Sequence, residues 1–253
     1  MMYELMTDLQ YRINFLFGFL GTIGWLFGEL AFLHFLIGQY DSIAGWDFYE
    51  MALLVGINQI WVGGLFYFMV WPSLSTFAEY IRTGELDRIL VRPIESKFYL
   101  SVFRIDWPSL AIAFTGFIVV CYSLLHIPGS ITISSVLSFI PLLILSCWIV
   151  YNVQFIASCS AFWITNAGSA IYIIGAIDRL SRFPYEIFTK GIVFILFTFV
   201  VPITIISNVP ARALLGILEF KYVLFSLFIG LVLFMVSRIV WKLGLRRYES
   251  ASS

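Results

Sequence analysis

The segment 72–106 is the part of the sequence in which charged and apolar side chains alternate most closely. Leu74, Phe77 and Ile81 recur at the spacing of one helix face, which predicts a short amphipathic helix that ends near Gly84. A second short helix with charged and apolar residues follows it. Such a segment offers both charge and apolar contact to a docking protein. The alternative is an interfacial helix that lies on lipid head groups.

Glu29 is the one acidic residue deep in an apolar run that is long enough to cross a bilayer. An ionisable group in such a position indicates a functional site, so contact with a transported substrate is one interpretation. The interpretation that we favour is a structural residue near the outer end of the run, hydrated or hydrogen-bonded. Asn58 and Gln59 either bond neighbouring helices, which we favour, or line a substrate path.

Several kinds of chemistry are excluded by what the sequence lacks. It has two distant histidines and three cysteines without a C-x-x-C pair, so we expect no metal site. No G-x-x-x-x-G-K-[ST] motif occurs, so the chain itself cannot hold the phosphates of ATP. An intramembrane acyltransferase or protease would need clustered His, Asp, Ser or Glu in the apolar runs, and only scattered ones occur.

The composition points to a membrane protein that crosses the bilayer several times. Of 253 residues, 61% are hydrophobic and 12% are charged, with a formal net charge of zero. A soluble domain of this size could not bury so many apolar side chains. This excludes an ordinary soluble enzyme, a disordered chain and a basic nucleic-acid-binding domain. We expect a single all-α transmembrane domain over residues 1–253.

Six membrane spans are expected from apolar runs of about 20 residues. Their ranges are 15–37, 51–71, 107–126, one span within 136–177, 192–206 and 222–241. The stretch 162–177 would extend the fourth helix or lie in the inner interface. Within the first span, small residues at positions 18, 21, 24 and 28 predict close approach of another helix.

The basic residues predict the orientation of these spans. With six spans and a cytoplasmic N-terminus, thirteen Lys and Arg residues fall inside and only Arg212 and Lys221 fall outside. Splitting 136–177 into two spans would move Arg179, Arg182 and Lys190 outside and spoil this bias. We therefore expect both termini in the cytoplasm, with the first span retained as an anchor.

The run Gly84-Glu85-Leu86-Asp87-Arg88-Ile89-Leu90-Val91-Arg92-Pro93 resembles the G-x-L-D-x-x-L-x-R-P loop of type-2 ABC exporter permeases. Two further stretches are similar to one bacterial six-span subfamily of these permeases, residues 182–188 with the prolines that follow, and residues 241–251. The motifs extend from residue 84 to residue 251, and the N-terminal third matches only in hydropathy.

This resemblance implies a half-transporter that pairs with a second permease, identical or a sister chain, and sits on two ABC ATPase subunits. It implies a coupling helix after the second span, an N-terminal interfacial helix over residues 3–12, and outer re-entrant helices over residues 207–220. Leu86, Ile89 and Leu90 would be the apolar anchor in the ATPase groove. The residues implied in coupling are Glu79, Gly84, Glu85, Leu86, Asp87, Arg88, Leu90, Arg92 and Pro93.

The function expected from the sequence is the membrane-spanning subunit of an ATP-driven exporter in the bacterial inner membrane. Its substrate would be hydrophobic or amphipathic: a lipid, drug, peptide or natural product. We expect contacts with membrane lipids, no nucleic acid and no cofactor of its own, because ATP would bind the partner subunits. The alternatives are an intramembrane enzyme and a structural subunit of a permease pair.

Overall fold

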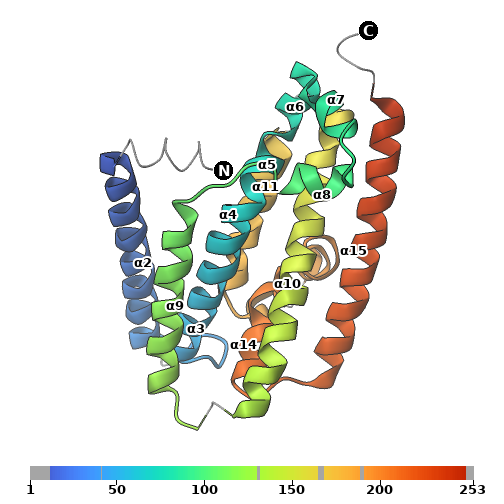
Figure 1. The fold of residues 1–253 in the computed structure, drawn as a ribbon. Coiled ribbons are helices and arrows are strands. Elements are labelled where there is room, and N and C mark those ends of the chain that lie inside the picture. Colours follow the sequence, from blue (N-terminus) through green and yellow to red (C-terminus); the bar gives the residue numbers. More distant parts are fainter. Residues whose placement is uncertain (1–11, 41, 130–131, 165–167, 189–190, 249–253) are drawn as a thin grey trace.

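The computed structural model describes residues 12–40, 42–129, 132–164, 168–188 and 191–248 (Figure 1). Within these ranges the regular structure is helical, and five helices are long and apolar enough to cross a membrane. The prediction of an all-α polytopic membrane protein is therefore confirmed. The predicted interfacial helix over residues 3–12 falls outside the described residues, apart from its last residue.

The five long helices form a bundle in which the first and third run in one direction and the other three run in the opposite direction (Figure 1). They are α2 (Arg12–Tyr40); a composite helix of α3 (Phe48–Asn58), the π-helical segment η1 (Gln59–Phe66) and α4 (Tyr67–Met69); α9 (Ser109–His126); α10 (Ile133–Cys159), extended by the 3₁₀ turn η2 (Ser160–Phe162); and α15 (Phe220–Arg247).

Four short helices cover one end of this bundle, which we call the loop end (Figure 1). They are α5 (Trp71–Ser75), α6 (Phe77–Thr83), α7 (Glu85–Leu90) and α8 (Ser96–Ser101), and together they form the loop region, residues 71–101. The opposite end, the far end, carries the turns that precede α3, α10 and α15. Both ends of the described chain lie at the loop end (Figure 1).

Local capping explains where two of the long helices begin. Asp47 Oδ1 accepts a hydrogen bond from the Glu50 amide at 2.8 Å, and Glu50 Oε2 accepts one from the Asp47 amide at 3.0 Å. This reciprocal capping box satisfies amides that α3 would otherwise leave without partners. Thr132 caps the start of α10, since its Oγ1 accepts a hydrogen bond from the Ser135 amide at 3.1 Å.

Close helix approach occurs at other glycines than the sequence predicted. A Cβ added at Gly64 would lie 2.4 Å from the Ala113 Cβ, and one at Gly116 would lie 2.7 Å from the Ile60 amide nitrogen. Small residues therefore let the composite helix of α3, η1 and α4 pack directly on α9. At positions 18, 21, 24 and 28 of α2 an added Cβ would meet no described atom within 4 Å. The predicted glycine stripe is not a packing seam among the described residues.

Of the two interpretations of residues 162–177, extension of the fourth helix is wrong. The helix ends with η2 at Phe162, and α11 (Gly168–Asp178) starts at the loop end and packs back along α10 (Figure 1). The reversal falls in a stretch without charged residues, so neither hydropathy nor charge placement marks it. The uninterrupted apolar run of the sequence therefore contains a full span and the start of a return.

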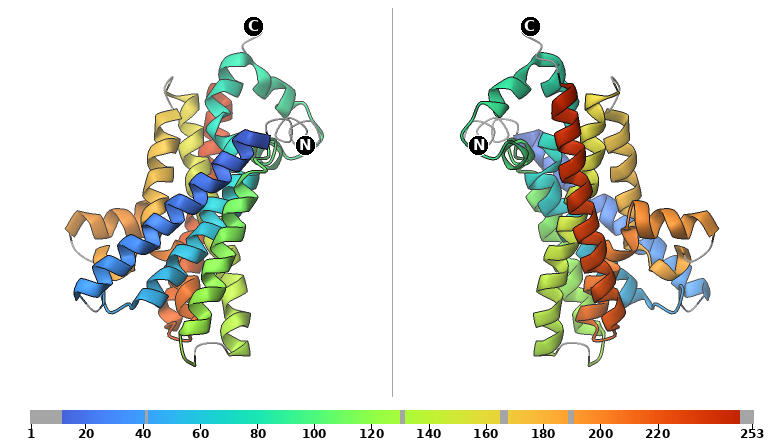
Figure 2. Two further views of the ribbon diagram at one scale, coloured as in Figure 1. Left: turned by 90° about the vertical axis from the view of Figure 1, so that its left-hand side faces the viewer. Right: turned by 90° about the vertical axis from the view of Figure 1, so that its right-hand side faces the viewer.

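The predicted fifth span over residues 192–206 is also wrong as a continuous helix. It is divided into α12 (Gly191–Ile195), the π-helical turn η5 (Leu196–Val200) and α13 (Ile203–Ile206). Pro202, which lacks an amide hydrogen and has a fixed φ, lies at the break. Figure 2 shows α12 and η5 projecting sideways from the bundle.

The return from the loop end to the far end is instead made of short pieces. After α11 these are the 3₁₀ turns η3 (Arg179–Arg182) and η4 (Tyr185–Phe188), the segments just named, and α14 (Asn208–Leu214). Such irregular backbone is tolerated at membrane depth only where protein or a cavity shields it. α14 fills half of the stretch predicted as re-entrant helices, and its residues Asn208–Ala211 are buried.

Candidate functional site

The loop region is a packed unit rather than a loose connection. Phe77, Tyr80 and Leu100 of this region are fully buried against Phe155 of α10 and Trp241 of α15. Burial raises the pKa of the Tyr80 hydroxyl. Because its apolar side chains interlock with two long helices, the loop region has to move together with them.

The sequence-predicted apolar anchor is only partly available to a partner protein. Leu86 is 0% exposed and Ile89 is 2% exposed, and both belong to the same core as Phe77 and Tyr80. The prediction that Leu86 and Ile89 fill a groove of another protein is therefore wrong: α7 is amphipathic, and its apolar face is turned inward. Leu90 is partly buried against this core.

A different set of residues forms the exposed tip of the loop region. Val91 is 86% exposed and Ile94 is 50% exposed, and Arg92 and Pro93 between them are exposed as well. Arg92 lies over the Tyr99 ring at 4.6 Å. We call residues 91–95 the exposed tip, because here apolar and charged side chains both face away from the bundle.

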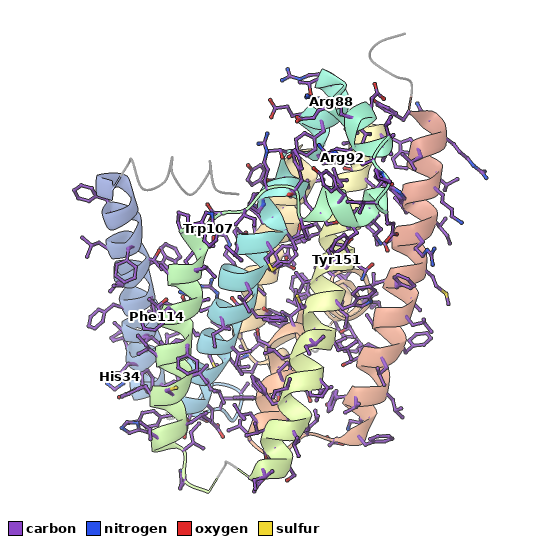
Figure 3. The ribbon with its side chains drawn as sticks, viewed as in Figure 1. His34, Arg88, Arg92, Trp107, Phe114 and Tyr151 are labelled. Atoms are coloured by element: carbon purple, nitrogen blue, oxygen red, sulfur yellow. The ribbon has the colours of Figure 1, made fainter. Side chains whose placement is uncertain are left out.

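The other residues proposed for coupling surround this tip. Arg88 Nη2 lies 3.5 Å from Glu85 Oε1, and the Arg88 side chain is 78% exposed. Figure 3 shows Arg88 and Arg92 at the loop end. Gly84 joins α6 to α7 with a φ of +72°, in the left-handed region that favours glycine. Asp87 is half-buried, and Glu79 is exposed on α6 beside an open groove.

A buried polar chain connects the loop region to the long helices. Lys97 Nζ of α8 donates to Ser237 Oγ of α15 at 2.8 Å, and Ser237 Oγ donates to Asn152 Oδ1 of α10 at 2.6 Å. Burial lowers the pKa of Lys97, whose ammonium also lies 4.6 Å from the Phe155 ring centre. The connection fixes α8 to α10 and α15.

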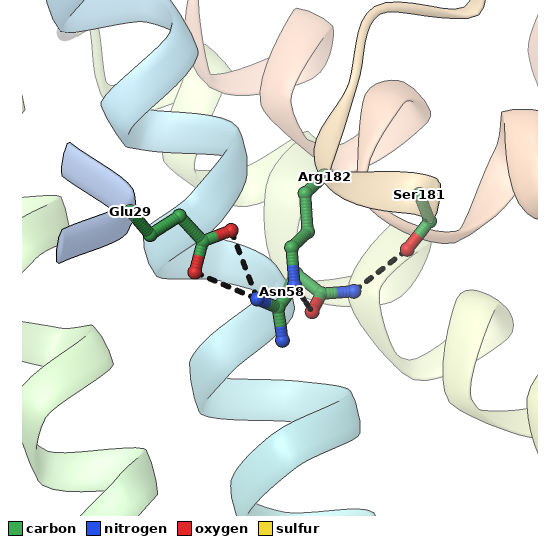
Figure 4. A network of polar contacts seen from close by, with 4 residues as sticks. All are labelled: Glu29, Asn58, Ser181 and Arg182. Atoms are coloured by element: carbon green, nitrogen blue, oxygen red, sulfur yellow. Dashed lines mark hydrogen bonds and ion pairs between the residues drawn. The ribbon is translucent and has the colours of Figure 1, made fainter. Parts of the chain in front are cut away.

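A second polar network lies inside the bundle, centred on Arg182 of η3 (Figure 4). Arg182 Nη1 donates to both carboxylate oxygens of Glu29, at 2.8 and 2.7 Å, and Arg182 Nε donates to Asn58 Oδ1 at 3.1 Å. Asn58 Nδ2 donates to Ser181 Oγ at 2.6 Å. The network joins α2, α3 and the broken return.

The depth of this network contradicts two expectations. Glu29 is near the middle of its apolar helix, Phe17–Tyr40, rather than near the outer end, and it is ion-paired. Arg179 and Arg182 were expected in a cytoplasmic loop, yet α11 places them about 16 Å below the loop end at 1.5 Å per residue. An arginine is stable at such a depth when a carboxylate and a carbonyl neutralise and bond it.

The excess of basic residues at the loop end remains when Arg179 and Arg182 are moved into the bundle. Without Arg179 and Arg182, and without Lys190, which lies outside the described residues, ten of the thirteen basic residues expected inside remain, all at or toward the loop end. Lys221 lies in the first turn of the last helix, at the far end, and Arg212 lies in α14 nearby.

Gln59, the third residue suggested for a substrate path, begins the π-helical segment η1. Together with Asn58 and Arg182 it lines a cavity of about 440 Å³ between α2, η1 and η3. A π-helical stretch inside an α-helix is often found at a functional site, because it re-aims the side chains on one face. The structure thus brings Glu29, Asn58 and Gln59 into one region of the bundle.

Sequence reasoning missed the partners of these residues. It did not single out Ser181 or Lys97, and it assigned Arg182 to a loop. One signal was present: a lone acidic residue in a span often pairs with a basic residue at the same depth. Pairing Glu29 with the basic residues of the weakly apolar stretch after residue 177 would have selected Arg179 or Arg182.

The fold and these two regions define a class of protein: a multi-pass helical membrane protein, with a packed helical region at one end and polar groups inside the bundle. The chain belongs to the ABC-2 family of transporter proteins, whose family model matches residues 23–252. No curated protein and no solved structure matches the sequence significantly. Membership of this family makes the chain a permease component of an ABC transporter and implies partnering with an ATPase subunit.

Proposed function

We propose that the chain is the membrane-spanning half of an ATP-driven exporter and that the loop region receives the movement of the ATPase subunit. The observation that carries this proposal is the burial pattern of the loop region. Its inner side chains interlock with α10 and α15, whereas Val91 and Ile94 at its tip are exposed. A surface that is rigidly attached inside and apolar outside suits the transmission of force from a docked partner.

The coupling residues divide into two roles in this proposal. Arg88, Arg92 and Pro93, with Val91 and Ile94, contact the ATPase subunit. Glu85 orients Arg88, and Gly84 makes the turn between α6 and α7. Leu86 and Leu90 hold α7 in place, and Asp87 and Glu79 lie at the edge of the contact. The Lys97–Ser237–Asn152 chain then passes a displacement of α8 to α15 and α10.

The proposed assembly is a dimer of permeases, identical or sister chains, on two ATPase subunits in the bacterial inner membrane. The chain crosses the membrane six times, with a broken fifth crossing, and the loop end faces the cytoplasm. The ten basic residues at or toward the loop end support this orientation. The substrate is hydrophobic or amphipathic, and its path passes Glu29, Asn58 and Gln59.

The docking proposal is tested by placing charge on the exposed tip. The tagged permease is purified from its native membrane, and the ATP hydrolysis that accompanies it is measured. Val91→Asp combined with Ile94→Asp should reduce that activity at least about tenfold, because charges are unfavourable in the core of an interface. Ile133→Asp is the matched control, since Ile133 is 83% exposed at the far end. Equal activity of the double variant and the control would reject docking at the tip.

The orientation is tested separately with single cysteines in a background without the three native ones. Ser42→Cys at the far end should react with an impermeant maleimide added to intact cells, and Val91→Cys should react only after the cells are opened. The reverse pattern would place the loop region outside the cell and would contradict the proposal.

A further inference from the structure

The wall of the cavity of about 440 Å³ beside the Arg182 network carries a positive charge, that of Arg179, which the network does not neutralise. Arg179 lines the cavity next to Arg182, and the other walls come from α2, η1 and α9. Arg182 is engaged by Glu29, as Figure 4 shows. Arg179 has no acidic partner among the residues that the structure describes, and its side chain is exposed.

The position of Arg179 makes this charge unusual. It directly follows the eleven residues of α11, so it lies about 16 Å from the loop end, roughly half of a hydrocarbon core of about 30 Å. An arginine at such a depth is unfavourable unless it meets water or an anion. Asp178, its neighbour in sequence, is not the counter-ion of Arg179. It is 1% exposed, accepts a hydrogen bond from Gln154 Nε2 at 2.5 Å and is not part of the cavity wall.

The remaining walls combine hydrogen-bonding groups with apolar surface. Gln59 and Tyr67 line the same cavity, and Trp25, which is 67% exposed, offers an apolar face. An anionic head group would find a guanidinium and neutral donors here, and an apolar body would lie against Trp25. Glu29, the only acid of the network, is already paired.

We infer that this cavity binds the anionic head group of an amphipathic molecule, a carboxylate or a phosphate, with Arg179 as its counter-ion. The inference rests on the proposed transport function, and it narrows the substrate class to amphipathic anions. Considered from the sequence alone, Glu29 suggests a cationic ligand. The structure points to an anionic ligand instead, because Glu29 is paired with Arg182 and Arg179 is the charge that faces the cavity.

The test measures binding to the purified permease alone, in a neutral detergent, so that it does not depend on an ATPase subunit. The probes are 11-(dansylamino)undecanoic acid, its methyl ester and the corresponding dansyl alkylamine. The acid should bind at least about tenfold more tightly than the ester or the amine. Arg179→Gln should remove this preference, whereas Arg246→Gln, the same change at an exposed position of α15, should leave it intact.

A second variant keeps the test valid if Arg179→Gln does not fold. An added Cβ at Gly21, which lines the cavity, meets no described atom within 4 Å. Gly21→Leu should therefore fill the cavity, abolish binding of the acid and leave the melting temperature of the permease unchanged. Equal binding of acid, ester and amine by the wild-type protein, or undiminished binding by both variants, would overturn the inference.

Two sources of the anion are separated by a competition arm. If phosphatidylglycerol in nanodiscs displaces the acid probe and phosphatidylcholine does not, the head group belongs to a bilayer lipid. If neither lipid displaces it, the site serves a free amphipathic acid. If the permease binds the acid selectively but no ATPase associates with it, the proposed function is refuted and the anion site stands. If an ATPase is coupled to the permease but binding is not selective for the acid, the proposed function stands and the anion site is refuted.

Discussion

The loop region and the Arg182 network use charged and apolar residues in opposite ways. In the loop region the apolar side chains of α7 are buried and the charges lie outside, with Arg88 78% exposed. In the bundle interior the charges are enclosed, with the Arg182 side chain 11% and the Glu29 side chain 17% exposed, and apolar residues surround them. Charge therefore stabilises internal structure in the bundle, whereas the exposed charges of the loop region are accessible for the partner recognition that we propose.

The largest effect should come from removing one member of the interior pair. Arg182→Gln leaves Glu29 without its counter-charge, and losing one partner of a buried pair costs about 3–5 kcal/mol. We expect a strongly lowered melting temperature in detergent. The double variant Glu29→Gln with Arg182→Gln should recover most of the loss, because both charges are gone. A double variant less stable than Arg182→Gln alone would show that the two residues are not coupled.

The loop region should show a sharp contrast between neighbouring apolar residues. Leu86→Ala creates a cavity in a closed core and should cost about 2–5 kcal/mol. Val91→Ala changes a side chain that is 86% exposed and should alter stability by less than about 0.5 kcal/mol. The two variants are compared by thermal unfolding of the permease alone. Equal losses would mean that the distinction between core and tip is wrong.

These two regions were also unequally accessible to sequence reasoning. The loop region was predictable because its signals are local: a helix stripe, Gly84 and a contiguous motif from residue 84 to residue 93. What the motif could not give was the direction in which α7 turns its apolar face, since Leu86 is buried by residues as distant as Phe155 and Trp241. For this reason the proposed contact with the ATPase subunit uses the exposed Val91 and Ile94 in place of the buried Leu86 and Ile89.

The interior network was largely inaccessible to sequence reasoning because its members are distant in the chain. Arg182 and Glu29 are 153 positions apart, and Asn58 and Ser181 are 123 apart. Hydropathy assumes that a span is one continuous helix, so the broken return appeared as a loop followed by a span at 192–206. The all-α membrane class survived this error, because it depends on composition and on the long apolar runs.

A smaller effect is expected at the turn between α6 and α7. Gly84 has a φ of +72°, and a β-branched residue is strained there, so Gly84→Val should cost about 1–3 kcal/mol. Gly84→Asn should cost clearly less, because asparagine tolerates the left-handed region. The melting temperatures of the two variants are compared with that of the wild-type permease. Identical values for valine and asparagine would argue against the left-handed turn.

The smallest stability effect is expected at the exposed ion pair of α7. Arg88→Ala removes a contact of 3.5 Å to Glu85, and exposed pairs contribute about 0–1 kcal/mol. The melting temperature should therefore hardly change, although ATP hydrolysis by the assembled transporter should fall. A large loss of stability in the permease alone would show that Arg88 has a structural role instead.

Docking at the loop region is tested most directly by protection of the exposed tip by the ATPase subunit. Val91→Cys and Ile133→Cys are prepared in a background that lacks the native cysteines, and maleimide labelling is measured on the permease with and without its ATPase. If the ATPase subunit docks at the exposed tip, labelling at position 91 should be slowed at least about tenfold in the assembled transporter, while labelling at position 133 should be unchanged. Equal labelling at position 91 in both states would contradict docking at the loop region.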